Sequence, residues 1–179
     1  MRKVIHKWFW MWDFEKEEQW LNEMAAKGLA LVGVGFCRYE FEDCAPGEYK
    51  VCLELLENNS HGAENEKYIG FLEETGAEHV GTWFRWAYFR KKAADEDFAL
   101  FSDNDSRINY LTRIIRMVAL LGGVNLYIGC YNLFLFFTWD NGVNLLGVIN
   151  LLIAAIAAVG LFRLLQKRKK LQREQQIFE

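Results

Sequence analysis

Residues 118–139 read VALLGGVNLYIGCYNLFLFFTW, and residues 141–162 read NGVNLLGVINLLIAAIAAVGLF. Neither stretch contains Asp, Glu, Lys or Arg, and each matches the roughly 20 apolar residues that cross a hydrocarbon core about 30 Å thick. A water-facing helix of this length would show a polar residue every three or four positions, whereas these stretches contain only scattered Asn, Thr and Tyr. The sequence therefore predicts a transmembrane hairpin over 118–165, with spans at about 118–138 and 142–163. The alternative is a very hydrophobic hairpin buried in protein.

The basic residues that flank these stretches predict their orientation. Arg107, Arg113 and Arg116 precede the first span, and a basic cluster over 163–173 follows the second. The connecting residues 138–142 contain no Lys or Arg. Because positively charged flanks stay in the cytoplasm, we expect a protein of the cell (inner) membrane with both termini cytoplasmic. Residues 166–179 are then expected to form a basic cytosolic helix.

Each predicted span also carries a narrow stripe of small and amide residues at helical spacing. Small side chains let two helices approach closely, and Asn can form a hydrogen bond across the contact. We therefore expect these residues to pack the hairpin together or to join it to another copy in a homo-oligomer. A polar pore is the alternative, although neither span contains an ionisable residue. The stripe residues are Gly122, Asn125, Gly129 and Asn132 in the first span and Gly147, Asn150, Ala154 and Ala157 in the second.

Residues 1–93 have the mixed composition of a globular domain, and no signal peptide is apparent, so we expect this domain in the cytosol. No fixed-period repeat is apparent either. Strand and helix patterns follow one another in the order βαββαβ, which predicts a ferredoxin-like α+β fold with two helices on one face of a four-stranded sheet. Residues 94–117 are expected to form a linker and a juxtamembrane helix. The strands are expected at 3–12, 29–42, 48–57 and 80–91, and the helices at 14–27, after an N-cap at Asp13, and at 64–75.

The predicted strands contain more aromatic rings than one helix-covered sheet face can bury. Alternation along a strand sends about half of them to the opposite face. We therefore expect an open sheet face that carries Trp8, Trp10, Trp83 and Trp86 and meets a partner, which is a second copy, another protein or a small ligand. The alternative is an aromatic-rich core, with the remaining rings at the membrane surface.

No pattern of catalytic or cofactor-binding residues is present, so the sequence predicts a protein that is not an enzyme and that has no cofactor. Nucleic-acid binding is not expected, because the domain is acidic and the third strand offers only Tyr49 for base stacking. No metal site is expected, since the scattered candidates do not form a four-ligand set. These candidates are His6, His61, His79, Cys37 and Cys52, the last two being potential cross-strand neighbours.

The segment KVIHKWFWMWDFEKEEQWLNEMAAKGLAL, residues 3–31, contains the pattern E-x-x-W-L-N-x-M-A-x-x-G-L. This pattern, after an aromatic first strand, resembles the bacterial domain-of-unknown-function (DUF) family 2812. The resemblance covers about residues 3–92, and the anchor layout is also similar. It implies a membrane protein under regulatory control, since such genes often lie beside PadR-like regulators, and it implies no catalytic residues. The pattern residues are Glu17, Trp20, Leu21, Asn22, Met24, Ala25, Gly28 and Leu29.

These observations together predict a membrane-anchored cytosolic module with a sensory, regulatory or scaffolding role that associates with itself. The alternative is an oligomeric membrane protein related to channels or transporters, built from the same hairpins.

Overall fold

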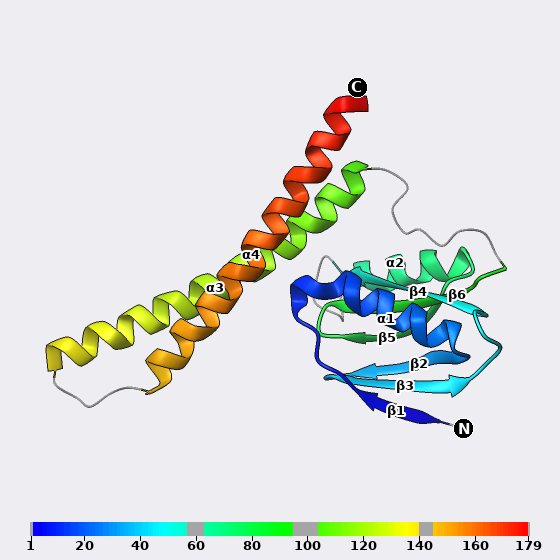
Figure 1. The fold of residues 1–179 in the computed structure, drawn as a ribbon, viewed down its shortest axis with the longest axis horizontal. Coiled ribbons are helices and arrows are strands. Elements are labelled where there is room, and N and C mark those ends of the chain that lie inside the picture. The colour runs from blue at the N-terminus through cyan, green and yellow to red at the C-terminus, as the bar shows by residue number, and fades with distance from the viewer. Residues whose placement is uncertain (1, 57–62, 95–103, 140–144, 179) are drawn as a thin grey trace. The chain divides into compact units, whose positions relative to one another are not determined.

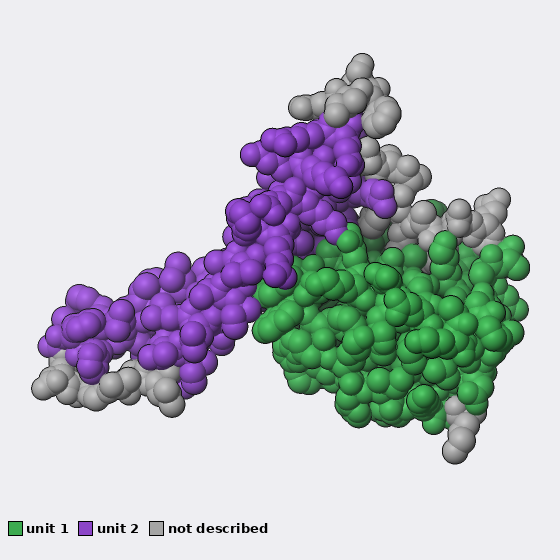
Figure 2. All heavy atoms as spheres, in the orientation of Figure 1, with its two compact units in different colours: residues 1–102 green, residues 103–179 purple. Residues whose placement is uncertain are grey.

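The computed structural model describes residues 2–56, 63–94, 104–139 and 145–178. The chain divides into two compact units, residues 1–102 and 103–179, which are coloured separately in Figure 2. Unit 1 is a mixed domain of helices and strands, and unit 2 is a pair of long helices (Figure 1). The expected α+β class with two apolar C-terminal helices is therefore confirmed.

Unit 1 contains six strands in two three-stranded antiparallel sheets, of order β1-β3-β2 and β4-β6-β5. A single four-stranded ferredoxin-like sheet was expected, so the topology differs from the prediction. The elements in chain order are β1 Lys3–His6, the 3-10 helix η1 Met11–Asp13, α1 Phe14–Ala26, β2 Leu29–Gly35, β3 Arg38–Asp43, β4 Tyr49–Leu55, α2 Ala63–Glu74, β5 Glu78–Trp83 and β6 Trp86–Lys92.

The difference arises at two tight turns, each inside a stretch that was predicted to be one strand. The chain reverses at Phe36-Cys37 between β2 and β3, and at Phe84-Arg85 between β5 and β6. Cys37 and Phe84 have φ angles of 51° and 56°, in the left-handed region that Gly and Asn usually occupy in hairpin turns. Because neither turn contains Gly or Asn, the usual sequence signal for a hairpin is absent.

The structure reveals a repeat that is not apparent in the sequence, in which a βαββ unit occurs twice with an offset of 48 residues. Gly28 and Gly76 both follow a helix with positive φ, and both second strands have a register shift, between Leu31 and Gly33 and between His79 and Gly81. Residues 28–42 and 76–90 read GLALVGVGFCRYEFE and GAEHVGTWFRWAYFR. Most of their aligned positions hold different residues, which explains why the repeat is hard to detect from the sequence. We call residues 3–43 repeat 1 and residues 49–92 repeat 2.

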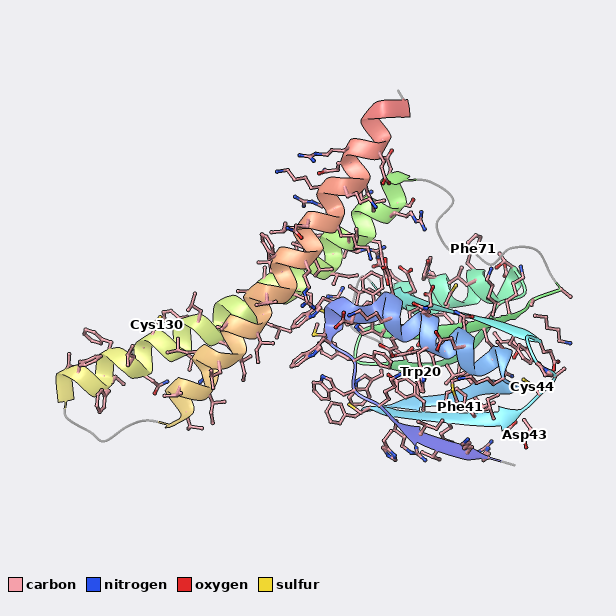
Figure 3. All side chains as sticks on the ribbon, in the orientation of Figure 1. Trp20, Phe41, Asp43, Cys44, Phe71 and Cys130 are labelled. Carbon is pink, nitrogen blue, oxygen red and sulfur yellow. The ribbon has the colours of Figure 1, made fainter. Side chains whose placement is uncertain are left out.

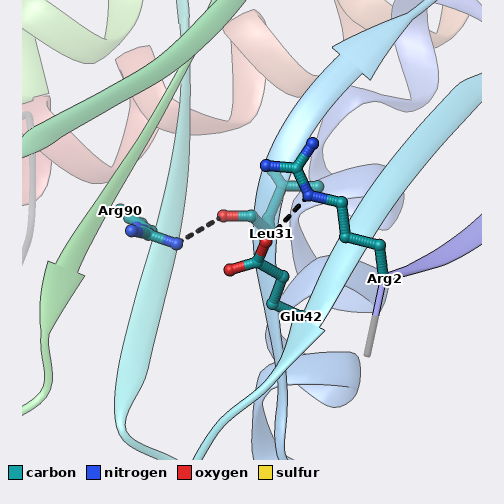
Figure 4. A network of polar contacts seen from close by, with 4 residues as sticks. All are labelled: Arg2, Leu31, Glu42 and Arg90. Carbon is teal, nitrogen blue, oxygen red and sulfur yellow. Dashed lines mark hydrogen bonds and ion pairs between the residues drawn. The ribbon is translucent and has the colours of Figure 1, made fainter.

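The two repeats meet along β2 and β5. A Cβ added to Gly81 would lie 3.1 Å from Val34 Cγ2, so the two strands approach closely at this point. Arg90 of repeat 2 donates a hydrogen bond of 2.9 Å from Nη1 to the carbonyl oxygen of Leu31 in repeat 1 (Figure 4). Arg2 binds Glu42 close by, at 2.8 Å. Close packing at Gly81 and the hydrogen bond from Arg90 to Leu31 hold the repeats against each other, whereas the Arg2–Glu42 pair lies within the first sheet.

Helix α1 also bridges the two repeats, because its side chains bind the outer edge of β4. Asn22 forms hydrogen bonds with the N–H and the C=O of Val51, both at 2.9 Å. Glu18 accepts a hydrogen bond of 2.9 Å from the N–H of Leu53. A free strand edge is thereby covered by a helix instead of by another strand.

The N-terminal segment differs from the predicted strand 3–12. β1 ends at His6, and the last main-chain contact with β3 and its turn is the hydrogen bond from Lys7 N–H to Cys37 O, of 3.1 Å. Asp13 occupies the expected N-cap position of α1, but its side chain forms no cap hydrogen bond. It binds Lys16 instead, at 2.7 Å.

Unit 2 consists of α3, Asn104–Trp139, and α4, Leu145–Phe178, which pack along each other. Segments at 105–138 and 146–175 are long and apolar enough to cross a membrane. Only 11% of the residues in the most apolar stretch of each are buried. A core helix of a soluble protein would be mostly buried, so the exposed apolar surface of both helices indicates a membrane protein.

Candidate functional site

A carboxylate, Glu17, lies on the buried face of α1. It precedes Leu21 by one turn and Met24 by two, so it continues the apolar stripe that packs against the strands. Glu17 is 8% exposed, and Leu21 is fully buried. Asn65 of α2, which is also buried, occupies the equivalent position 48 residues later. A polar group at this place in the core is therefore common to the two repeats.

Two tyrosines from different repeats hold this carboxylate. The hydroxyl of Tyr39 on β3 donates a hydrogen bond of 2.7 Å to Glu17 Oε1, and the hydroxyl of Tyr88 on β6 donates one of 2.6 Å to the same oxygen. Both tyrosines are at most 4% exposed. Glu17 is thus the point at which α1 and strands from both sheets meet.

Burial raises the pKa of Glu17 above its ordinary value, and the hydrogen bonds from Tyr88 and Tyr39 partly oppose this shift. Burial also raises the pKa values of both tyrosines, as does the nearby carboxylate, so both phenols remain protonated hydrogen-bond donors. The site is a carboxylate with two fixed donors on one oxygen.

No Lys or Arg in the described part of the chain forms an ion pair with Glu17. Both tyrosine hydroxyls bind Glu17 Oε1. No donor among the described residues binds Glu17 Oε2. A buried carboxylate without a cationic partner is costly in its charged form. Glu17 can be neutralised either by protonation, which its raised pKa favours, or by a positive charge brought to the site.

Further aromatic rings lie on the elements that supply Glu17 and the two tyrosines. The Tyr39 ring lies 5.1 Å from Trp20 between centroids, and Phe14 stacks on Trp86 at 5.6 Å. Figure 3 shows Trp20 of α1 beside Phe41 of β3, where the two centroids are 5.8 Å apart. Tyr39 and Phe41, like Trp86 and Tyr88, are two positions apart on one strand and so point to the same face.

A cation already binds one side of this cluster. The ammonium nitrogen of Lys7 lies 4.5 Å from the ring centroid of Trp20 and 4.9 Å from that of Phe9. Both distances are within the range of cation–π attraction. The rings next to Tyr39 are thus arranged to accept positive charge.

The tryptophans predicted for a partner face lie in two different environments. Trp8, Trp10 and Trp83 are exposed, whereas Trp86 is only 7% exposed and belongs to the interior beside Phe14. The exposed rings lie at one end of the hairpins, next to the Phe36-Cys37 and Phe84-Arg85 turns.

The small residues predicted for helix packing are brought together at three points between α3 and α4. A Cβ added to Gly122 would lie 3.0 Å from Ala157 Cβ, one at Gly147 would lie 2.8 Å from Asn132 Cβ, and one at Gly129 would lie 2.7 Å from the Leu151 side chain. Ala154 is buried and Asn150 half-buried. The Asn125 and Asn132 amides donate hydrogen bonds to carbonyls of their own helix, Leu121 and Ile128. Self-association and a pore both stay predictions.

The described residues contain no group of three or more His, Cys, Asp or Glu that could hold a metal ion. Cys37 and Cys52, expected as potential neighbours, lie in different places, since Cys37 is in the β2–β3 turn and Cys52 is in β4 opposite Phe89. Burial raises the pKa of Cys52 to about 12, which makes it a poor nucleophile. His61 lies outside the described residues.

The family model described as "Protein of unknown function (DUF2812)" matches residues 13–122. The chain belongs to this family. No curated protein and no solved structure matches this chain. The resemblance seen in the sequence motif is therefore confirmed, and the DUF2812 match reaches from the N-cap of α1 into α3.

Each residue of the DUF2812 motif has a defined place in the fold. Leu21, Met24 and Ala25 fill the core, Asn22 binds β4, and Gly28 ends α1 with a φ of 82°. Glu17 was part of this motif, but sequence reasoning did not identify it as a site. The available signal was its spacing, because a carboxylate one turn before Leu21 and two before Met24 lies on an otherwise apolar face.

Proposed function

We propose that this DUF2812 protein is a membrane-anchored sensory module whose soluble unit binds an amphipathic organic cation at Glu17. The observation that carries the proposal is a buried carboxylate, held by tyrosines from both repeats, that has no cationic partner among the described residues. A bound cation would neutralise the carboxylate in a region of low dielectric constant, where the attraction between opposite charges is strong.

The surroundings of Glu17 favour a cation with an apolar body over a metal ion or a small amine. The rings of Phe14, Trp20, Tyr39 and Trp86, which pack on one another beside the site, would give the apolar body of a bound cation a hydrophobic environment. Hard metal ions require several oxygen ligands, and Glu17 is a single carboxylate. An anion would be repelled.

A sensory role follows from the position of the site between the repeats. Tyr39, Tyr88 and Glu17 belong to β3, β6 and α1, so a ligand that draws Glu17 away from the tyrosines would alter the contact between the two repeats. The cytoplasmic orientation expected from the flanking basic residues would place this unit at a membrane where amphipathic cations accumulate.

The test uses the full chain in detergent micelles with tetraphenylphosphonium as the probe. We expect saturable binding in equilibrium dialysis against protein-free micelles, and an affinity loss of at least about tenfold, or about 1.4 kcal/mol, in Glu17→Gln. Glu23→Gln is the matched control, because Glu23 is an exposed carboxylate on the same helix. Tetraphenylborate, which has the opposite charge and similar shape, should not bind.

The pH dependence of binding gives a second readout. Because a cation favours ionised Glu17, affinity should rise as the pH rises through the pKa of this carboxyl, and Glu17→Gln should lose that dependence. Equal affinity of the wild-type chain, Glu17→Gln and Glu23→Gln for tetraphenylphosphonium would contradict the proposal.

A further inference from the structure

A second feature of unit 1 is an exposed group of rings at the turn end of the hairpins, which we call the aromatic tip. It consists of Trp8, Trp10, Phe36, Trp83 and Phe84, which are between 41% and 63% exposed. The centroids of Trp8 and Trp10 are 5.5 Å apart, those of Trp8 and Phe36 are 5.9 Å apart, and those of Phe36 and Trp83 are 5.6 Å apart. The rings thus form one continuous apolar surface contributed by both repeats.

Rings of this size are seldom left together in water, so a continuous patch indicates a contact surface. The exposed groups are distinct from the Glu17 site, whose residues Tyr39, Tyr88 and Trp86 are buried. The binding partner of the aromatic tip is therefore independent of the cation proposed for Glu17.

The three segments that form the aromatic tip carry basic residues. Its three segments read KWFWMW at 7–12, VGFCR at 34–38 and TWFRW at 82–86. They contain Lys7, Arg38 and Arg85 and no acidic residue, although Arg38 pairs with Glu40 of β3 at 2.6 Å and Arg85 donates hydrogen bonds to the Leu56 carbonyl oxygen. Residues 1–102 as a whole carry 12 Lys and Arg against 19 Asp and Glu, a net charge of −7. The aromatic tip is thus a basic region on an acidic unit.

We propose that the aromatic tip docks on the interfacial region of an anionic bilayer, the same membrane that α3 and α4 cross. Trp is enriched at the boundary between head groups and acyl chains, where its ring is buried and its N–H remains hydrated. Lys and Arg beside it are attracted to anionic lipid head groups. The acidic remainder of unit 1 is repelled by the same surface, which orients the tip toward it.

The length of the connection keeps unit 1 close to this surface. Residues 93–103 join β6 to α3 and reach about 40 Å at most at about 3.5 Å per residue, and the part of α3 that precedes the predicted span adds about 20 Å at about 1.5 Å per residue. A tether of this length gives the tip a high effective concentration at the bilayer, so weak contacts suffice for docking.

A second copy of the chain fits the aromatic tip less well than lipid does. A symmetric dimer brings the same patch of both copies together, so Lys7, Arg38 and Arg85 of one copy would face the same cations of the other. Like charges at an interface oppose association. An anionic bilayer presents the complementary charge.

The test uses the full chain with fluorotryptophan in nanodiscs of phosphatidylcholine and phosphatidylglycerol in equal parts. Single Trp→Phe variants assign the fluorine NMR signals. With a gadolinium chelate on the lipid head groups, we expect the signals of Trp8, Trp10 and Trp83 to broaden beyond detection. Trp139, which directly follows the first predicted span, is the positive control, and discs without the chelate give the unbroadened reference.

Two further measurements separate the possible occupants. In discs of phosphatidylcholine alone, and in the double variant Phe36→Ser/Trp83→Ser, the broadening of Trp8 and Trp10 should decrease. The inference would be overturned if Trp8, Trp10 and Trp83 broaden only with a water-soluble gadolinium chelate. It would also be overturned if neither chelate broadens them and the particle mass shows two copies per disc, which would assign the aromatic tip to a second chain.

Discussion

Asn22 forms with Val51 the same pair of main-chain hydrogen bonds that a neighbouring strand would form, one from its amide nitrogen to the carbonyl and one from the N–H to its amide oxygen. Asn22 of repeat 1, together with Glu18 at Leu53, thus covers the outer edge of β4 in repeat 2. Unpaired strand edges invite association with other chains. The motif residue Asn22 therefore protects the edge and also joins the repeats.

Replacing Asn22 tests this relationship. Asn22→Ala leaves the N–H and C=O of buried Val51 without partners, which we expect to destabilise unit 1 by about 1–3 kcal/mol. Asn22→Asp, which keeps an acceptor for the N–H, should lose less. Denaturant unfolding of the full chain in micelles, followed by near-ultraviolet circular dichroism, measures both. Gln19→Ala, an exposed change on the same helix, should be neutral, and an equal loss in this control would refute the assignment.

The end of α1 makes a second prediction. Gly28 has a φ of 82°, and a Cβ there would lie 2.9 Å from the carbonyl oxygen of Cys44. Gly28→Ala should therefore destabilise unit 1 by more than about 1 kcal/mol. Gly70 lies inside α2 with no atom within 4 Å of an added Cβ, so Gly70→Ala should instead stabilise by about 0.5–1 kcal/mol. The same denaturant unfolding measures the change in stability of both variants. Changes of the same sign in Gly28→Ala and Gly70→Ala would contradict the structure.

The protonation of Glu17 predicts a pH dependence of stability. Its pKa in the folded state is raised by burial, so folding favours the protonated form. The corresponding stability is fully present below the unfolded pKa of 4.5 and is lost as the pH rises through the raised value. Glu17→Gln should remove this part of the decline, so the variant gains on the wild-type chain toward neutral pH. A residual slope is expected, because burial also raises the pKa of Glu18. Thermal unfolding between about pH 4 and pH 8 measures the difference, and a variant that loses stability against the wild-type chain toward neutral pH would show that the ionised carboxylate is favoured.

The contact between α3 and α4 makes a further prediction. Gly129→Ala brings a Cβ within 2.7 Å of the Leu151 side chain and 3.2 Å of its backbone nitrogen, and Gly147→Ala brings one within 2.8 Å of Asn132 Cβ. Either change should separate the helices and cost about 1–3 kcal/mol through overpacking. Gly123→Ala, with no atom within 4 Å of the added Cβ, is the matched control.

Double electron–electron resonance between two nitroxide labels measures the distance between α3 and α4 in bilayers. The labels are placed by Tyr127→Cys and Leu152→Cys, both at exposed positions, in a chain whose other cysteines are replaced by serine. A distance that lengthens equally in all three glycine variants would refute close packing at Gly129 and Gly147.

The sequence alone predicted the membrane-crossing helices, the class of the domain and the end of α1 at Gly28, because each depends on local composition or spacing. An uncharged run of about 20 residues needs no tertiary partner to be recognised. The hairpins of both repeats were missed because Cys37 and Phe84 adopt positive φ without a Gly or Asn signal.

Only the tertiary structure decided that Glu17 meets two tyrosines, since Tyr39 is 22 residues away and Tyr88 is 71 residues away. Glu17 is buried at this site because repeat 2 packs against repeat 1. No local sequence pattern encodes a contact between residues that are so far apart in the chain. The same closure placed Trp86 inside the domain while Trp8, Trp10 and Trp83 remained outside. Periodicity gives the face of a strand or helix to which a side chain points, whereas packing decides what that face meets.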